Sequence, residues 1–191
     1  MRGPFARVVC TLTVVQAGSG QLPLMAAQVP HPPVAPAPVA SPAVPRAPLA
    51  NCVVARLADG DSLTCVDGRK VRLLLIDTPE MAQKPWGLMA KRQLEALARP
   101  GTVLRLERDK TRADRYGRTL AYAWVGDVMV NERLVASGWA VVLAYGDVRY
   151  LERMKRAERA AQAAKKGFWQ EWAFRCRPVD FRARRCGDSR K

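Results

Sequence analysis

The run CVVARLADGDSLTCVDGRKVRLLLID, from Cys52 to Asp77, predicts the start of a β-rich domain. It contains three segments rich in β-branched and apolar residues, which are separated by ADGDS at Ala58–Ser62 and by VDGR at Val66–Arg69. Asp-Gly pairs are frequent in the tight turns that join antiparallel strands. We therefore predict three consecutive strands joined by two short turns.

The residues that follow predict two more strands and three helices. Apolar residues at helical spacing, with glycine or proline at the ends, indicate helices at Met81–Arg99, Met129–Ser137 and Leu151–Lys166. Short β-rich runs indicate strands at Val103–Glu107 and Thr119–Val125. Five strands with interspersed helices predict an α+β fold, namely a five-stranded OB-type β-barrel with three packed α-helices.

The residues before this domain indicate export. Arg2 and Arg7 precede a short apolar run and a stretch of small residues, so we expect a signal peptide over residues 1–27. No uninterrupted apolar run approaches the roughly 18–20 residues that a transmembrane helix needs. Residues 28–50 hold eight of the fourteen prolines and predict an extended linker. We therefore expect a periplasmic or secreted protein with its domain at residues 51–172.

Charge and histidine content restrict the chemistry. The formal charge of +15 favours a polyanionic partner, either nucleic acid or an acidic membrane surface. The single histidine, His31, lies in the proline-rich segment, so the domain itself has no imidazole. This excludes histidine-dependent nucleases, Ser-His-Asp hydrolases and histidine zinc sites. The remaining candidates are Asp, Glu, Arg, Lys and Tyr side chains.

Four cysteines remain once the predicted leader is set aside: Cys52, Cys65, Cys176 and Cys186. An even number in an exported chain favours two disulfides, and proximity in sequence suggests 52–65 and 176–186. The predicted turn between the first two cysteines leaves them a few residues out of register, which counts against that pair. Neither pair has the short spacing of a cysteine zinc site.

Acidic side chains follow two of the predicted strands. Asp61 lies in the first turn and Asp77 ends the apolar run, while Pro79 turns the chain so that the Thr78 carbonyl can be exposed. Two carboxylates and one carbonyl suit Ca²⁺, with water and a substrate phosphate completing the coordination. An Asp-Gly-Asp turn alone is more often only a hairpin turn. The prediction therefore depends on these fragments occurring together.

A candidate base and two candidate phosphate ligands lie beside these acids. Glu80 is the best available group to activate a water, although such a residue is also common at a helix N-terminus. Arg72 and Arg118 can bind phosphate oxygens in pairs, although most arginines are surface charges. In a regular strand Arg72 and Asp77 would point to opposite faces, so we expect a bulge or an early strand end between them.

The motifs DGDS, RLLLIDTPE and DRYGRTLAY, followed by MVNERLVASGWA and KKGFW, resemble the staphylococcal nuclease (thermonuclease) family in type and order. The resemblance covers roughly Val53–Trp169. It implies an OB-type barrel with three helices and Ca²⁺-dependent hydrolysis of DNA and RNA that leaves 3′-phosphate ends. It also implies the following roles: calcium binding by Asp61, Asp77 and the Thr78 carbonyl, general-base catalysis by Glu80, contacts to the scissile phosphate by Arg72 and Arg118, and a nucleotide contact by Tyr116.

Three features depart from the family pattern. Ser62 stands where the family usually has threonine, Met81–Trp86 is shorter than the lysine-bearing loop of the best-known member, and Ala144–Gly146 lacks a pair of spaced tyrosines. These differences affect the expected contacts with substrate, whereas all of the candidate catalytic residues are present. The tail at residues 173–191 lies outside the resemblance. We interpret it as a disulfide-tied cap, or else as an extra basic contact surface.

Together these features predict an exported, monomeric, calcium-dependent nuclease that acts on DNA and RNA through a basic surface, with little sequence specificity. Tyr116, and also Trp86 or Tyr145, are candidates to stack on bases. The main alternative is a non-catalytic nucleic-acid-binding OB module, which would be expected to have lost part of the acidic set. A third possibility is an envelope-associated anchor built from the proline-rich segment and the basic helix.

Overall fold

The computed structural model describes residues 50–144, 146, 149–170 and 176–187. All of them belong to one of two compact units of the chain, Ala43–Lys191. The predicted signal peptide and linker lie outside the described residues, apart from Ala50, and remain predictions. Within the described ranges no helix is both long enough and apolar enough to cross a membrane.

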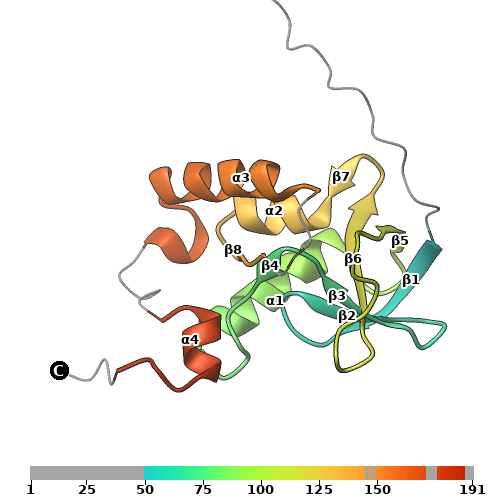
Figure 1. The fold of residues 1–191 in the computed structure, drawn as a ribbon, viewed down its shortest axis with the longest axis horizontal. Coiled ribbons are helices and arrows are strands. Elements are labelled where there is room, and N and C mark those ends of the chain that lie inside the picture. Colours follow the sequence, from blue (N-terminus) through green and yellow to red (C-terminus); the bar gives the residue numbers. More distant parts are fainter. Residues whose placement is uncertain (1–49, 145, 147–148, 171–175, 188–191) are drawn as a thin grey trace, which may run out of the picture. The chain divides into compact units, whose positions relative to one another are not determined.

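A closed five-stranded barrel forms the centre of the described chain (Figure 1). Its strands are β1 (Ala50–Leu57), β2 (Ser62–Cys65), β3 (Lys70–Leu73), β5 (Val103–Glu107) and β6 (Thr119–Val125). They are hydrogen-bonded in the order β3-β2-β1-β5-β6, and parallel pairing of β3 with β6 closes the barrel. The other pairings within the barrel are antiparallel. The predicted barrel is confirmed.

Alternating apolar residues of these strands fill the barrel, because successive side chains of a strand point to opposite faces. Val54, Val71 and Leu104 are fully buried. A disulfide joins Cys52 to Cys65, with 5.3 Å between their Cα atoms. The register places Cys65 opposite Val54, and an irregularity in β1 follows Val54. The offset that counted against this pair in the sequence is therefore small enough to be bridged.

Three main helices cover the barrel: α1 (Trp86–Leu97), α2 (Val130–Ala136) and α3 (Leu151–Ala163). The helix α2 packs against β6 and α3, and α1 packs against α2 and β1. Shorter elements are β7 (Val128–Met129), the 3₁₀ helix η1 (Gly167–Gln170) and α4 (Pro178–Arg182). Figure 1 shows α4 beside the start of α1, away from the α2–α3 pair.

The start of α1 corrects the prediction of a helix from Met81. The helix begins at Trp86, and Pro85 is its N-cap residue. Proline suits a helix start because its missing N–H is not needed there. Residues 81–84 form turns, and the backbone N–H of Gln83 donates to the carbonyl of Glu80 at 2.8 Å. Glu80 is therefore not the first residue of a helix.

The strand is interrupted after β3, and this interruption changes the relative directions of the Arg72 and Asp77 side chains. The strand β3 ends at Leu73, and Leu75 adopts a left-handed backbone with a φ of 60°. The chain then forms β4 (Ile76–Asp77), which pairs with β8 (Val141–Val142). Because the strand ends early, as expected, the regular alternation between Arg72 and Asp77 is lost.

Candidate active site

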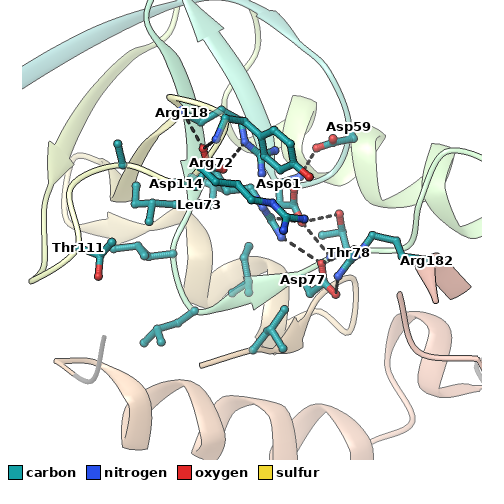
Figure 2. Close-up of a pocket in the computed structure, with 18 of the residues that line it drawn as sticks. Asp59, Asp61, Arg72, Leu73, Asp77, Thr78, Thr111, Asp114, Arg118 and Arg182 are labelled. Carbon is teal, nitrogen blue, oxygen red and sulfur yellow. Dashed lines mark hydrogen bonds and ion pairs between the residues drawn. The ribbon is translucent and has the colours of Figure 1, made fainter. Parts of the chain in front are cut away.

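A pocket of about 760 Å³ opens where the β1–β2 turn, the β3–β4 interruption and the loop before β6 meet. The residues predicted to bind the metal, to catalyse the reaction and to contact the nucleotide through Tyr116 all line this pocket: Asp61, Arg72, Asp77, Thr78, Glu80, Tyr116 and Arg118. They come from segments that are distant in sequence. Figure 2 shows Asp61, Asp77 and the arginines directed toward one another.

The two carboxylates are buried and share one guanidinium. Asp61 is 5% exposed and Asp77 is 1% exposed. Arg72 forms an ion pair with Asp61, and its Nη2 donates to Oδ1 of Asp77 at 3.0 Å. A single cation therefore already lies within reach of both acids (Figure 2). Burial without such a partner would be costly for either charge.

Backbone and side-chain donors fix the Asp61 carboxylate. The backbone N–H and the hydroxyl of Thr78 both donate to Oδ2 of Asp61 at 3.0 Å, and the Ser62 hydroxyl donates to Oδ1 at 3.0 Å. The turn itself is tightly packed. A Cβ atom at Gly60 would lie 2.8 Å from both the Ala90 Cβ and the Thr78 hydroxyl oxygen.

Arg118 joins this cluster through Ser62. Its Nη1 donates to the Ser62 hydroxyl at 3.3 Å, and its Nε donates to Oδ2 of Asp114 at 2.6 Å. The backbone N–H groups of Tyr116 and Arg118 both donate to Oδ1 of Asp114 at 2.9 Å. Asp114 therefore shapes the loop that presents Arg118. Tyr116 is 67% exposed at the pocket, where the Arg118 guanidinium lies 5.6 Å from its ring centre.

Several ionisable groups of the pocket have shifted pKa values. Burial, together with the nearby charge of Asp61, raises the pKa of Asp59 to about 6. Burial also raises the pKa of Asp77, although Arg182 and Arg72 oppose that shift. The pKa of Arg72 is raised because the attraction of Asp61 and Asp77 outweighs the opposing effect of burial. In Asp59 and Asp77 burial is the largest cause of the pKa shift, and nearby arginines oppose it.

The oxygen atoms present fit a hard cation such as Ca²⁺. Asp61 and Asp77 lie close enough to share the Arg72 guanidinium, and Thr78 follows directly in the chain. Among the residues that the structure describes, no three His, Cys, Asp or Glu side chains form a metal-binding group by themselves. A calcium ion here would therefore also need the Thr78 carbonyl, water and substrate oxygens.

An arginine from the C-terminal segment also enters the pocket, and the sequence did not predict this. Nη1 of Arg182 donates to Oε1 of Glu80 at 2.6 Å and to Oδ1 of Asp77 at 3.0 Å, and Nη2 donates to Oδ2 of Asp77 at 2.8 Å. The hydrogen bond to Asp77 raises the pKa of Arg182 further above its ordinary value. Figure 2 shows Arg182 approaching Asp77 from a different side than Arg72.

Comparison with known families covers most of the residues of this pocket. A family model described as "Staphylococcal nuclease homologue" matches residues 70–171, which is more than half of the chain. The chain belongs to the staphylococcal nuclease family. The matched residues include Arg72, Asp77 and Glu80, together with Tyr116 and Arg118.

Several nucleases are similar to this member of the family. The thermonuclease of Staphylococcus hyicus is 39% identical over 129 residues, covering 61% of this chain and 73% of the relative. The thermonuclease of Staphylococcus intermedius is 35% identical over 127 residues, covering 62% of this chain and 75% of the relative. Endonuclease YncB of Bacillus subtilis (strain 168) is 35% identical over 135 residues, covering 65% of this chain and 64% of the relative.

One further expectation for the pocket differs from this family member's structure, and another is not tested by it. Trp86, a candidate to stack on bases, packs against Trp139 with 6.4 Å between ring centres, and it does not line the pocket. Tyr145 lies outside the described residues. Arg182 lies beyond the family match, in a part of the chain for which the motifs gave no role. Its only signal in the sequence is a run of arginines between two cysteines.

Proposed function

We propose that this protein is an exported, calcium-dependent nuclease that hydrolyses phosphodiester bonds of DNA and RNA with little sequence preference. The observation that carries the proposal is the meeting of Asp61, Asp77 and Glu80 with Arg72 and Arg118 in one pocket. The membership of this chain in the staphylococcal nuclease family supports hydrolysis of nucleic acid. Relatives named thermonuclease and endonuclease support the same reaction class.

In this proposal Asp61, Asp77 and the Thr78 carbonyl hold the calcium ion. Such an ion, when bound, would offset the negative charge of a substrate phosphate. The protein prepares the site by fixing Asp61 with three hydrogen bonds before any ligand arrives. Preorganised oxygen ligands lose less entropy on binding than mobile ones.

Glu80 is the proposed general base. Its side chain is 37% exposed, so water can reach it, and the residue lines the pocket together with Asp77. In the reaction Glu80 accepts a proton from a water whose oxygen bonds to phosphorus. The bond from phosphorus to the 5′-oxygen of the next nucleotide breaks, and that oxygen takes up a proton from solvent. One product then ends in a 3′-phosphate and the other in a 5′-hydroxyl.

Arg72 and Arg118 would stabilise the charge that builds up on the phosphate oxygens. Permanently charged guanidinium groups suit this role because each can bind two oxygens. The Asp114 carboxylate holds Arg118, and Tyr116 lies exposed beside it, where it can contact a nucleotide. The strongly basic composition would attract the backbone of either nucleic acid without reading its bases.

Two disulfides support the proposed export to the periplasm or the medium. The structure contains Cys52–Cys65 and Cys176–Cys186, and such bonds persist mainly in oxidising compartments. The predicted signal peptide over residues 1–27 agrees with this destination. We further propose that the exported domain acts as a monomer.

Digestion of single-stranded DNA, duplex DNA and RNA tests the function. Each substrate is incubated with the oxidised protein in Ca²⁺ or in excess chelator. Glu80→Gln and Arg118→Ala should each lose at least about 10²-fold in rate, because they remove a general base and a charge-stabilising group. The exposed residues of α1 supply matched controls, and Glu95→Gln and Arg92→Ala should keep wild-type rates.

The same assay separates catalysis from the alternative of a non-catalytic binding module. Such a module would retain DNA in a gel-shift experiment and yet release no new ends in Ca²⁺. Wild-type rates in both Glu80→Gln and Arg118→Ala would contradict the proposed roles. Hydrolysis that persists in excess chelator would contradict the calcium requirement.

A further inference from the structure

The C-terminal segment from Cys176 to Gly187 is a compact loop closed by a disulfide. Cys176 and Cys186 are bonded across a separation of ten residues, and the short helix α4 lies between them. Within the loop, Nη2 of Arg185 donates to Oδ1 of Asp180 at 2.8 Å. We call residues 176–187 the C-terminal clasp. It has its own internal contacts and is not an extended tail.

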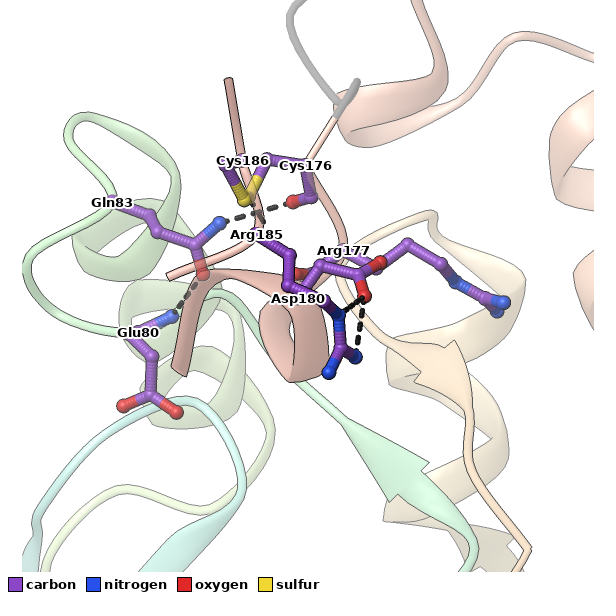
Figure 3. Close-up of a disulfide and its surroundings, with 7 residues drawn as sticks. All are labelled: Glu80, Gln83, Cys176, Arg177, Asp180, Arg185 and Cys186. Atoms are coloured by element: carbon purple, nitrogen blue, oxygen red, sulfur yellow. Dashed lines mark hydrogen bonds and ion pairs between the residues drawn. A yellow bond between two sulfur atoms is a disulfide. The ribbon is translucent and has the colours of Figure 1, made fainter. Parts of the chain in front are cut away.

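The glutamine side chain of Gln83 links the clasp to the loop that carries Glu80. The Gln83 side-chain amide donates from Nε2 to the Cys176 carbonyl at 3.1 Å, and its Oε1 accepts the Glu80 backbone N–H at 2.9 Å. Figure 3 shows this bridge between the disulfide and Glu80. The clasp is therefore fixed directly beside the candidate base.

From this position α4 delivers Arg182 to the two acids that the proposed reaction needs. Both terminal nitrogens of Arg182 are engaged, with Asp77 receiving two hydrogen bonds and Glu80 one. Together with Arg72, this arginine engages both oxygens of the Asp77 carboxylate. The positive charge of Arg182 lies on the same carboxylate that a cation would use.

This geometry would oppose both calcium binding at Asp77 and proton acceptance by Glu80. A calcium ion that coordinates Asp77 must displace at least part of the Arg182 contact or share the carboxylate with a second positive charge. The hydrogen bond from Arg182 also occupies Oε1 of Glu80, the carboxylate that the proposed reaction uses to accept a proton from water. Both terminal nitrogens of Arg182 face these acids. Arg182 and a bound calcium ion would therefore compete for the same carboxylate oxygens.

We propose that the C-terminal clasp is a built-in competitor of the metal ion, which holds Arg182 on Asp77 and Glu80 until calcium and substrate displace it. The inference rests on the proposed calcium site. The disulfide makes the competition effective, because a closed loop keeps Arg182 at a high local concentration near the acids. Opening the disulfide would lower that concentration and relieve the competition.

Calcium binding to the purified full chain, measured by isothermal titration calorimetry without substrate, tests the proposal. Arg182→Gln should lower the Kd for Ca²⁺ by about fivefold or more, which is the lower end of typical coupling between linked sites. The matched control is Arg177→Gln, which removes the same charge from the same clasp. Arg177 is exposed, and in Figure 3 its side chain points away from Glu80. This control should change the Kd by less than about twofold.

The disulfide is tested by the double variant Cys176→Ser, Cys186→Ser. It should bind Ca²⁺ more tightly than the wild type, and adding Arg182→Gln to it should tighten binding no further than Arg182→Gln alone. A Kd in Arg182→Gln that is unchanged or higher would overturn the clasp proposal, and so would an equal effect of Arg177→Gln. Failure of every variant to bind Ca²⁺ would instead remove the calcium site, and the clasp proposal with it.

Discussion

Thr78 donates both its backbone N–H and its hydroxyl to the same oxygen, Oδ2, of Asp61, and each hydrogen bond is 3.0 Å long. The two residues are 17 positions apart in the sequence. This contact fastens the turn after β4 to the turn between β1 and β2. The spacing of the candidate metal ligands therefore depends on it.

Thr78→Val tests that fastening, because valine keeps the shape and removes the hydroxyl. We expect the Kd for Ca²⁺ to rise about tenfold, the equivalent of one hydrogen bond to a charged group. Thr78→Ser retains the hydroxyl and should bind within about twofold of the wild type. Calorimetric titration measures both variants. Equal Kd values in valine and serine would show that the hydroxyl does not position Asp61.

Gly60→Ala should move the turn that carries Asp61. The added methyl would lie 2.8 Å from the Ala90 Cβ and from the Thr78 hydroxyl, so the turn must shift. We expect urea denaturation to give a loss of about 2 kcal/mol in the free energy of unfolding, as for other overpacked sites. Gly187→Ala, where the methyl meets open space, should change the stability by less than about 0.5 kcal/mol.

Asn131 supports the interruption that separates Arg72 from Asp77. This buried amide donates to the Leu74 carbonyl at 2.9 Å and accepts the Ala123 backbone N–H at 2.9 Å. Asn131→Ala leaves both backbone groups without that partner, so we expect a loss of about 3 kcal/mol in urea denaturation. The exposed Asn51→Ala is the control. A similar small loss in both variants would contradict a structural role for Asn131.

Asp59 should make stability depend on pH in the metal-free protein. Its pKa is raised from 3.8 to about 6 by burial, so the folded state keeps a proton that the unfolded state releases as pH rises from about 4 to 6. Stability therefore falls through that window. Asp59→Asn removes the half-buried charge, and its side-chain oxygen can still accept the Asp61 backbone N–H, which lies 3.0 Å from Oδ1 in the wild type.

Thermal unfolding in chelator checks this prediction. Asp59→Asn should be more stable than the wild type by about 2 kcal/mol at pH 8, and the two proteins should converge near pH 4. The exposed Asp127→Asn controls for the loss of a negative charge. The prediction is contradicted if Asp59→Asn is less stable than the wild type at pH 8, or if the difference in stability between the two proteins does not change with pH. Either result would show that ionisation of Asp59 does not destabilise the folded protein.

Local sequence patterns predicted much of the fold. The strands Val103–Glu107 and Thr119–Val125 have the predicted bounds, because alternating apolar residues and flanking turn residues are local signals. The β4–β8 pair was not predicted. It consists of two short strands whose pairing joins residues about 65 positions apart, and no local pattern reports such a contact. The late start of α1 at Trp86 shows the same limit at an element boundary.

The candidate site shows a similar division. Asp61, Asp77 and Arg118 lie in motifs whose order and residue types are informative in the sequence itself. Arg182 lies among several arginines of a tail that no motif covers, and its contact with Asp77 spans 105 positions. Only the folded chain distinguishes this arginine from its neighbours.

Hydrolysis of single-stranded DNA across a range of free Ca²⁺ concentrations, by wild type and by Asp77→Asn, tests the central proposal most directly. We predict that wild-type hydrolysis requires Ca²⁺ and that Asp77→Asn needs at least about tenfold more of it for half-maximal rate, because one anionic ligand is lost. The same Ca²⁺ dependence in both proteins, or wild-type cleavage in excess chelator, would contradict the proposal.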